Sequence, residues 1–170
     1  DHPEAVQWRN RLAKTGAEGF AEGLSKNKAL KVLDLSDTRI ESNGAQAIGD
    51  SLGVNSHLCE LNLQATNFSA KGMKCLGASL GKNAALTSLN LNENWFGDMG
   101  AIALGRSMVG NTSLKSLQLI KCKFTVPGAC SIAYARETMP AMQKINMAGN
   151  YIGNTGAQAL ARAIARNRNL

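Results

Sequence analysis

The residues that could carry out catalysis form no recognisable catalytic motif in this chain. The histidines are His2 and His57, and neither lies within a Cys/His/Asp set of metal-ligand spacing. The chain contains neither the GxxxxGK pattern of a phosphate-binding loop nor a GxSxG pattern. We therefore expect a protein that is not an enzyme, with no catalytic residue, no cofactor and no metal site.

Asp34 and Glu60 are the nearest approach to a catalytic pair. General acid–base chemistry uses carboxylates that a fold holds close together, and these two lie in the similar stretches LKVLDL and LCELNL. The alternative is a solvated acidic end of a binding surface, and this is the interpretation that we favour.

The four cysteines, Cys59, Cys75, Cys122 and Cys130, include no pair with CxxC spacing. Their positions in a repeat predict that Cys75 points inward and that Cys59 and Cys130 face water, which does not suit disulfides. We expect four free thiols and a cytoplasmic, reducing compartment. The Asn-x-Ser sequons at Asn67 and Asn111 argue weakly for secretion instead.

The sequence is built on a repeat of 28 residues, and its copies follow one another without a change of length. LTSLNLNENWF, which begins at Leu86, has counterparts that begin at residues 30, 58, 114 and 142, and Leu170 opens a further, partial repeat. A glycine recurs at the same interval, from Gly44 to Gly156. Residues 1–29 predict a degenerate first repeat and its helix, so we expect residues 1–170 to form a single domain.

Each repeat predicts a strand, a loop, a helix and a second loop. The alternation in LxxLxL is that of a strand, and the spacing of Ala101, Leu104 and Met108 is that of a helix. We expect N-caps at Ser42, Asp98 and Asn154, Pro127 in a first helical turn, and left-handed helix ends at Asn55, Asn83 and Asn111. Parallel stacking would bury the leucine columns and curve the chain into a horseshoe segment, with the sheet on the concave face and helices on the convex face.

The loop after each strand has a polar column of its own, which reads Thr38, Thr66, Asn94, Cys122 and Asn150. We expect these side chains to turn inward and bond the backbone of the turn, so their role is structural. Repeat 4 departs from the pattern, with Ile120 on the concave face and Arg136 in an apolar helix column. Its helix is therefore expected to shift or shorten before Pro140.

LKVLDLSDTRI, LCELNLQATNF and LTSLNLNENWF, each followed by a glycine and a helix, resemble leucine-rich repeats. The uniform unit with a full helix is similar to the ribonuclease-inhibitor subclass, which includes NOD-like receptors, tropomodulin-type domains and the activator of the Ran GTPase. This resemblance implies a non-enzymatic protein-interaction module, as a fragment of a larger intracellular receptor, scaffold or assembly protein. The alternative that it leaves open is a regulator of a small GTPase, with Arg39 reaching the partner's nucleotide.

A protein partner would meet the concave face and the loop rim beside it. Trp95 stands in a column of Arg39, Asn67, Lys123 and Tyr151, which faces solvent, and Trp and Tyr are enriched in binding hot spots. The alternative is that Trp95 folds down onto Asn67 and Lys123 as loop cover. The predicted partner-binding residues are Asp34, Arg39, Glu60, Asn62, Asn90, Asn92, Glu93, Trp95, Gln118, Lys121, Lys144 and Tyr151.

The formal net charge of +7 raises the question of nucleic acid. The basic residues are spread over helix columns, and the concave face has no aromatic–basic stripe, so we expect no nucleic acid. No apolar run is long enough to cross a membrane. At the C-terminal end, Ile152, Leu160 and Ile164 keep their apolar register, and nothing follows that is comparable to the polar first repeat expected from residues 1–11. We expect the chain to be incomplete there and to self-associate end to end through that edge.

Overall fold

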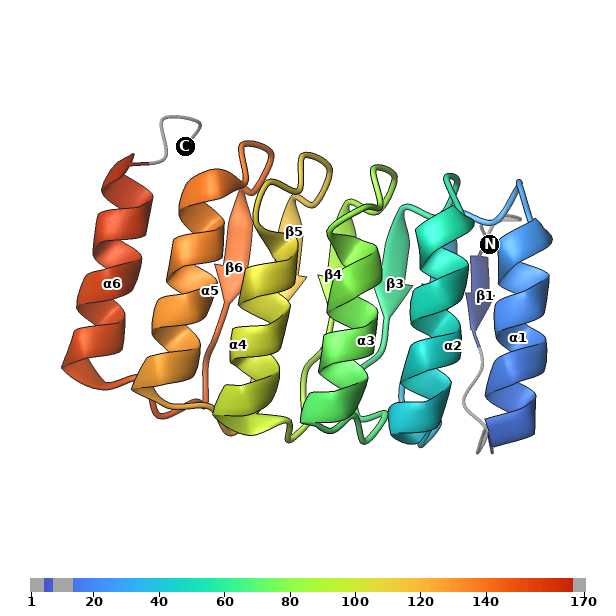
Figure 1. The fold of residues 1–170 in the computed structure, drawn as a ribbon, viewed down its shortest axis with the longest axis horizontal. Helices are drawn as coiled ribbons and strands as arrows, with labels where there is room; N and C mark the ends of the chain where they lie inside the picture. Colours follow the sequence, from blue (N-terminus) through green and yellow to red (C-terminus); the bar gives the residue numbers. More distant parts are fainter. Residues whose placement is uncertain (1–4, 8–13, 167–170) are drawn as a thin grey trace.

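The computed structural model describes residues 5–7 and 14–166, which form one layer of helices and one layer of strands (Figure 1). The strands are β1 (Ala5–Gln7), β2 (Val32–Asp34), β3 (Glu60–Asn62), β4 (Ser88–Asn90), β5 (Ser116–Gln118) and β6 (Lys144–Asn146). The helices are α1 (Lys14–Lys26), α2 (Glu41–Val54), α3 (Ala70–Leu80), α4 (Gly97–Met108), α5 (Val126–Thr138) and α6 (Gly153–Arg166).

The strands form one parallel sheet in chain order, from β1 to β6. Leu33 pairs with Leu61, Leu61 with Leu89 and Leu89 with Leu117, so the register advances by one repeat at each step. This confirms the predicted strands and their order. The first repeat also supplies a strand, although its leucine pattern is broken, and Ala5 pairs with Val32.

The core lies between the two layers and runs through all the repeats. Leu33, Leu89 and Leu117 on the strands and Ile48 and Leu104 on the helices are completely buried. Strands pair about 4.8 Å apart, whereas packed helices need about 10 Å. The stack therefore curves with the sheet inside, and the open side of the sheet is called the concave face below.

Asn94 ties the end of one strand to the end of the strand before it. Its amide nitrogen donates to the carbonyl oxygens of Leu63 at 2.7 Å and Leu91 at 3.1 Å, and its oxygen accepts from the Phe68 N–H at 2.9 Å. Asn94 and its counterpart Thr66 are fully buried, which agrees with the structural role predicted for this column.

A second asparagine ladder follows the helices, and here the prediction was wrong. Asn55, Asn83 and Asn111 do not adopt the left-handed conformation. They are buried instead: Asn83 donates to the Leu52 and Asn55 carbonyl oxygens and accepts from the Leu86 N–H at 2.7 Å. These side chains join successive repeats, because the backbone polar groups of a buried loop need partners.

The helix N-termini also differ from the prediction. Ser42, Asp98 and Asn154 lie inside the first turns of α2, α4 and α6, which begin at Glu41, Gly97 and Gly153. Those three starting residues have positive φ angles, of 60°, 60° and 55°. The starts of α3 and α5 are shifted by one position relative to this series, so the loops alternate with a period of two repeats.

Asp98 bonds the next helix rather than its own. Its carboxylate accepts from the N–H groups of Thr125 at 2.8 Å and Gly128 at 2.9 Å, and from the Thr125 hydroxyl at 2.7 Å. Ser42 contacts Ser69 in a similar way, before α3. Side chains of α2 and α4 therefore contact the starts of α3 and α5, the helices that follow them. Pro127 lies in the first turn of α5, as predicted.

Repeat 4 keeps its full helix. The expected shortening is wrong, since α5 has 13 residues and ends at Thr138. Arg136 takes the apolar column and is only 3% exposed, and burial lowers its pKa. Cys122 is buried, Cys59, Cys75 and Cys130 are partly exposed, and all four are free thiols. Cys75 is thus less enclosed than predicted.

The last repeat is less covered than the others. Ile164 is 52% exposed, and Ile152 and Leu160 are partly buried, whereas their counterparts Phe124 and Ile132 are buried. The partial repeat predicted at residue 170 lies outside the described residues. Among those described, no helix has the length and apolar character that crossing a membrane requires.

Candidate interaction surface

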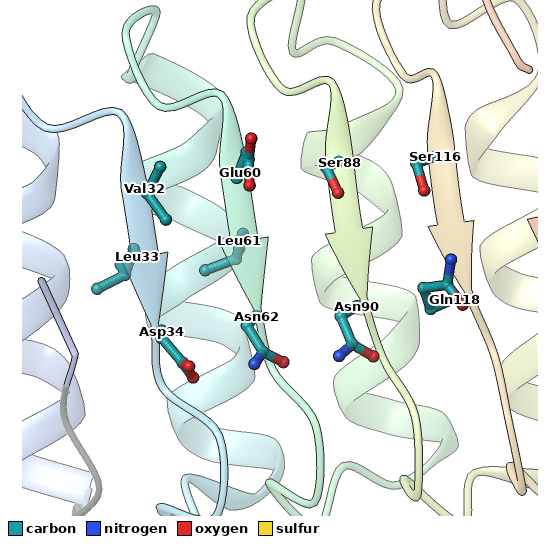
Figure 2. A pocket seen from close by; sticks show the side chains of 10 residues that line it. All are labelled: Val32, Leu33, Asp34, Glu60, Leu61, Asn62, Ser88, Asn90, Ser116 and Gln118. Carbon is teal, nitrogen blue, oxygen red and sulfur yellow. The ribbon is translucent and has the colours of Figure 1, made fainter. Parts of the chain in front are cut away.

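A shallow groove runs across the concave face from β2 to β5 (Figure 2). It is called the sheet groove below. Five of the predicted partner-binding residues lie together in it, and they come from neighbouring strands. Its polar lining consists of Asp34, Glu60, Asn62, Ser88, Asn90, Ser116 and Gln118.

The polar residues that end strands β2, β3 and β4 in the sheet groove have a structural role that the sequence did not indicate. The side-chain oxygens of Asp34, Asn62 and Asn90 each accept the backbone N–H two residues later, at 2.9–3.1 Å. Asx side chains stabilise chain reversals in this way. In repeat 4 the longer Gln118 takes this place, and Asn92 accepts from the Ile120 N–H at 2.7 Å. Asn92 therefore serves the loop of the next repeat.

A second hollow lies on the rim, in the loops that follow the strands. It is called the rim pocket, and its lining comprises Arg39, Glu41, Ala65, Asn67, Glu93 and Trp95. The repeat brings together Arg39, Glu93 and Trp95, which were predicted from the sequence. Glu41 and Asn67 were missed, although Asn67 shares the column of Trp95.

Trp95 is both exposed and in contact with a neighbour. Its side chain is 65% exposed, as predicted, and Lys123 Nζ lies 3.9 Å from the ring centroid. A cation over an indole face is attracted by the ring's quadrupole. Lys123 belongs to repeat 4, whereas all the residues that line the rim pocket belong to repeats 1–3. Lys123 therefore contacts Trp95 without lining the rim pocket.

The backbone of the rim pocket is strained. Arg39, Glu41, Ala65, Asn67 and Glu93 all have positive φ angles, between 50° and 63°. This conformation costs a residue other than glycine about 1–2 kcal/mol. The same conformation recurs outside the pocket at Asp37, Lys121 and Lys123, so it belongs to the loop of the repeat.

Lys121, Lys144 and Tyr151 extend the surface over repeats 4 and 5. All three are exposed, and Tyr151 is 74% exposed. A Cβ atom on Gly149 would lie 2.8 Å from Lys121 Cγ, so the lysine stem passes close over this glycine. Lys144 lies at the start of β6, away from the rim.

The charge of the chain is divided unevenly along the solenoid. Residues 1–98 contain ten basic and eleven acidic residues, whereas residues 99–170 contain nine basic residues and Glu137 as the one acid. The whole positive excess therefore lies on the C-terminal side of Asp98. The acidic residues of the sheet groove and rim pocket, and the lysines of repeats 4 and 5, follow this gradient.

The site offers polar and aromatic contacts rather than reactive groups. In the described part of the chain, no three histidine, cysteine or acidic side chains come together as a metal site would require. Burial raises the pKa of the Cys122 thiol to about 12, which keeps it protonated and unreactive. Asp34 and Glu60 both line the open sheet groove.

A model of the leucine-rich repeat matches residues 26–49, 54–77, 82–105 and 139–161, which is more than half of the chain. The stretch between the last two matched segments contains most of repeat 4, in which Cys122 takes the place that Asn94 has in repeat 3. No curated protein matches the sequence. Among solved structures, actin-binding site 2 of leiomodin-1 is similar, with a TM-score of 0.65 and 19% identity, over 98% of this chain and 81% of that one. The tropomodulin C-terminal domain of Caenorhabditis elegans has a TM-score of 0.60 and 12% identity, over 96% and 83%.

These two similarities agree with the fold, in which one strand and one helix alternate in every repeat. The chain belongs to the leucine-rich repeat family, and its repeats are of the ribonuclease-inhibitor-like type.

Proposed function

We propose that this chain is a protein-interaction module that binds a folded partner through the sheet groove and the rim pocket together. One observation carries the proposal: hydrogen bonds join the two surfaces. Asn90 of the sheet groove donates to the Gln64 side-chain oxygen at 3.4 Å, and Gln64 donates to Glu93 of the rim pocket at 3.1 Å. A single partner could therefore contact both without crossing a gap.

The uneven charge supports a partner of opposite polarity. Complementary potentials steer two proteins together and fix their orientation. The partner would be positive where it faces Asp34, Glu60 and Glu93, and negative where it faces Lys121 and Lys144. A fragment of an intracellular receptor, scaffold or assembly protein fits this role, in a reducing compartment that keeps the four thiols free.

Capture from cytosolic extract, followed by direct binding of the purified candidate, tests the proposal. Trp95→Ala and Glu60→Lys alter the two surfaces, and Tyr134→Ala on α5 is the control, because Tyr134 is an exposed aromatic residue of the helix layer. A partner of this surface binds the wild type and the control but is lost from both surface variants. Equal binding by all four proteins would refute the proposal. Actin is the first purified protein to test, since one similar structure is described as an actin-binding site.

Regulation of a small GTPase through Arg39 stays a prediction. Arg39 lines the rim pocket with Glu41 and Glu93, and an arginine that reaches a partner's nucleotide must leave such carboxylates. A GTP-hydrolysis assay with Arg39→Ala tests this alternative.

The exposed outer edge of repeat 5 supports a separate contact between copies of the chain. Ile164 is half exposed there, beside the partly buried Leu160. Apolar side chains beside a strand edge favour association, so we propose weak end-to-end pairing.

A further inference from the structure

We infer that the rim pocket binds an arginine side chain of the protein partner. The inference rests on the proposed function and adds the chemistry of one contact. It follows from two features of the rim pocket: an aromatic wall, and two carboxylates without ion-pair partners among the described residues.

Trp95 provides the aromatic wall. One side of its indole ring holds the Lys123 ammonium at 3.9 Å, which shows that a cation can occupy a face of this ring. Trp95 also lines the rim pocket and is largely exposed. A planar guanidinium can stack on an aromatic face, whereas an ammonium meets it only as a point charge.

Glu41 and Glu93 provide the negative charge. Glu93 Oε1 accepts from Gln64 at 3.1 Å, and both glutamates line the rim pocket. Across the part of the chain that the structure describes, no ion pair involves either glutamate. Arg39 lines the same hollow, so its charged residues sum to one negative charge. A carboxylate or phosphate ligand would be repelled, and a cation would be attracted.

The backbone allows the two glutamate side chains to be removed without a conflict with the loop conformation. Glycine stands at the positions equivalent to Glu41 in repeats 3 and 5, as Gly97 and Gly153, and at the position equivalent to Glu93 in repeat 5, as Gly149. All three glycines have positive φ angles, like the two glutamates. The fold thus accepts glycine at both positions, and the left-handed conformation of both glutamates is one that glycine adopts without steric cost.

Lys123 opposes the bound cation, but more weakly than the glutamates favour it. It does not line the rim pocket, whereas the carboxylates line the same hollow as the ligand. Since the Coulomb energy falls with distance, the net charge of −1 that lines the rim pocket acts on a ligand there at closer range than Lys123 does.

The test uses the tripeptide Ac-Gly-Arg-Gly-NH2, followed through the indole N–H signal of Trp95 by NMR at constant ionic strength. We expect saturable shifts of Trp95 and Glu93 with this peptide. The citrulline peptide has the same shape without the charge and should bind at least fivefold more weakly. The glutamate peptide should cause no shift. Equal binding of the arginine and citrulline peptides would overturn the inference.

Glu41→Gly and Glu93→Gly separate the ligand from the fold. Each should weaken arginine-peptide binding at least threefold while the melting temperature stays equal or rises. Asp37→Gly is the matched control, because Asp37 is also acidic and has the same left-handed backbone but does not line the rim pocket. It should change stability in the same direction and keep the peptide affinity. Wild-type affinity in both glutamate variants would also overturn the inference, yet a partner lost from Trp95→Ala and Glu60→Lys would still support the proposed function.

Discussion

The bonds from Asp98 to the next repeat make Asp98→Ala the most informative single substitution for stability. The change removes three hydrogen bonds, two of them from backbone N–H groups at the start of α5. Loss of a helix cap costs about 1 kcal/mol, and hydrogen bonds to a charged group contribute about 1.5–3 kcal/mol. Asp98 is only partly buried, so hydrogen bonds to water offset part of the lost free energy. We expect the free energy of unfolding to fall by about 2–3 kcal/mol.

The same carboxylate should make this difference depend on pH. Burial acts to raise the pKa of Asp98, but the hydrogen bonds from Thr125 and Gly128 together outweigh it, and the pKa lies below its usual value. The contribution is therefore complete above the unfolded pKa of about 3.9 and is lost as pH falls through the folded value. The gap between wild type and Asp98→Ala should be wide at pH 7 and narrow as pH falls below about 4.

Urea unfolding, followed by circular dichroism at several pH values, measures both effects. Asn154→Ala is the matched control, because Asn154 has the same position in α6 and makes no such bond among the described residues. It should change the free energy of unfolding by less than about 0.5 kcal/mol. A similar loss in both variants, or a gap for Asp98→Ala that does not change with pH, would refute the reasoning.

Three further predictions concern the ladder, the core and the edge. Asn94→Ala leaves the Phe68 N–H without its acceptor and removes bonds to two carbonyl groups, so urea unfolding should show a loss of about 3–5 kcal/mol; a loss below about 1 kcal/mol would contradict the ladder. Leu91→Ala should cost about 2–5 kcal/mol through a cavity, whereas Trp95→Ala should leave the melting temperature nearly unchanged and weaken the partner complex by about 2 kcal/mol or more in calorimetry; unfolding of Trp95→Ala would identify loop cover instead. Ile164→Glu should lower the average mass seen by light scattering at high concentration, and a wild type that is strictly monomeric would exclude end-to-end pairing.

The fold was predictable because its core repeats with one period. Leu33, Leu61 and Leu89 alternate with polar residues, and this pattern defines both the strand and the side of it that is buried. The role of Asn94 followed from its place after the strand. The helix starts did not follow, because Ser42 and Asp98 are good N-caps in isolation, and the structure uses them for the neighbouring helix instead.

The candidate site was only partly predictable. Arg39 and Trp95 share a column, so the repeat alone predicted that they lie on one rim. The role of Glu41 depends on a left-handed backbone that no sequence pattern marks, since glycine is the usual sign of it. The bonds of Asn62 and Asn90 were also hidden, because an exposed amide on a strand gives the same sequence pattern whether it binds a partner or its own backbone.

The alternating helix starts have a consequence for how the chain can be lengthened or shortened. Ser42 and Asp98 each bond the loop of the following repeat, whose helix starts one position later. Excision of a single repeat would place two loops with the same helix start side by side. The N–H and hydroxyl groups that Ser42 or Asp98 bonds would then lose their acceptor. Excision of residues 70–125 would instead join α2 to α5, which begins in the same phase as α3. The module that can be exchanged without altering a junction is therefore a pair of repeats, measured from the start of α3 to the start of α5.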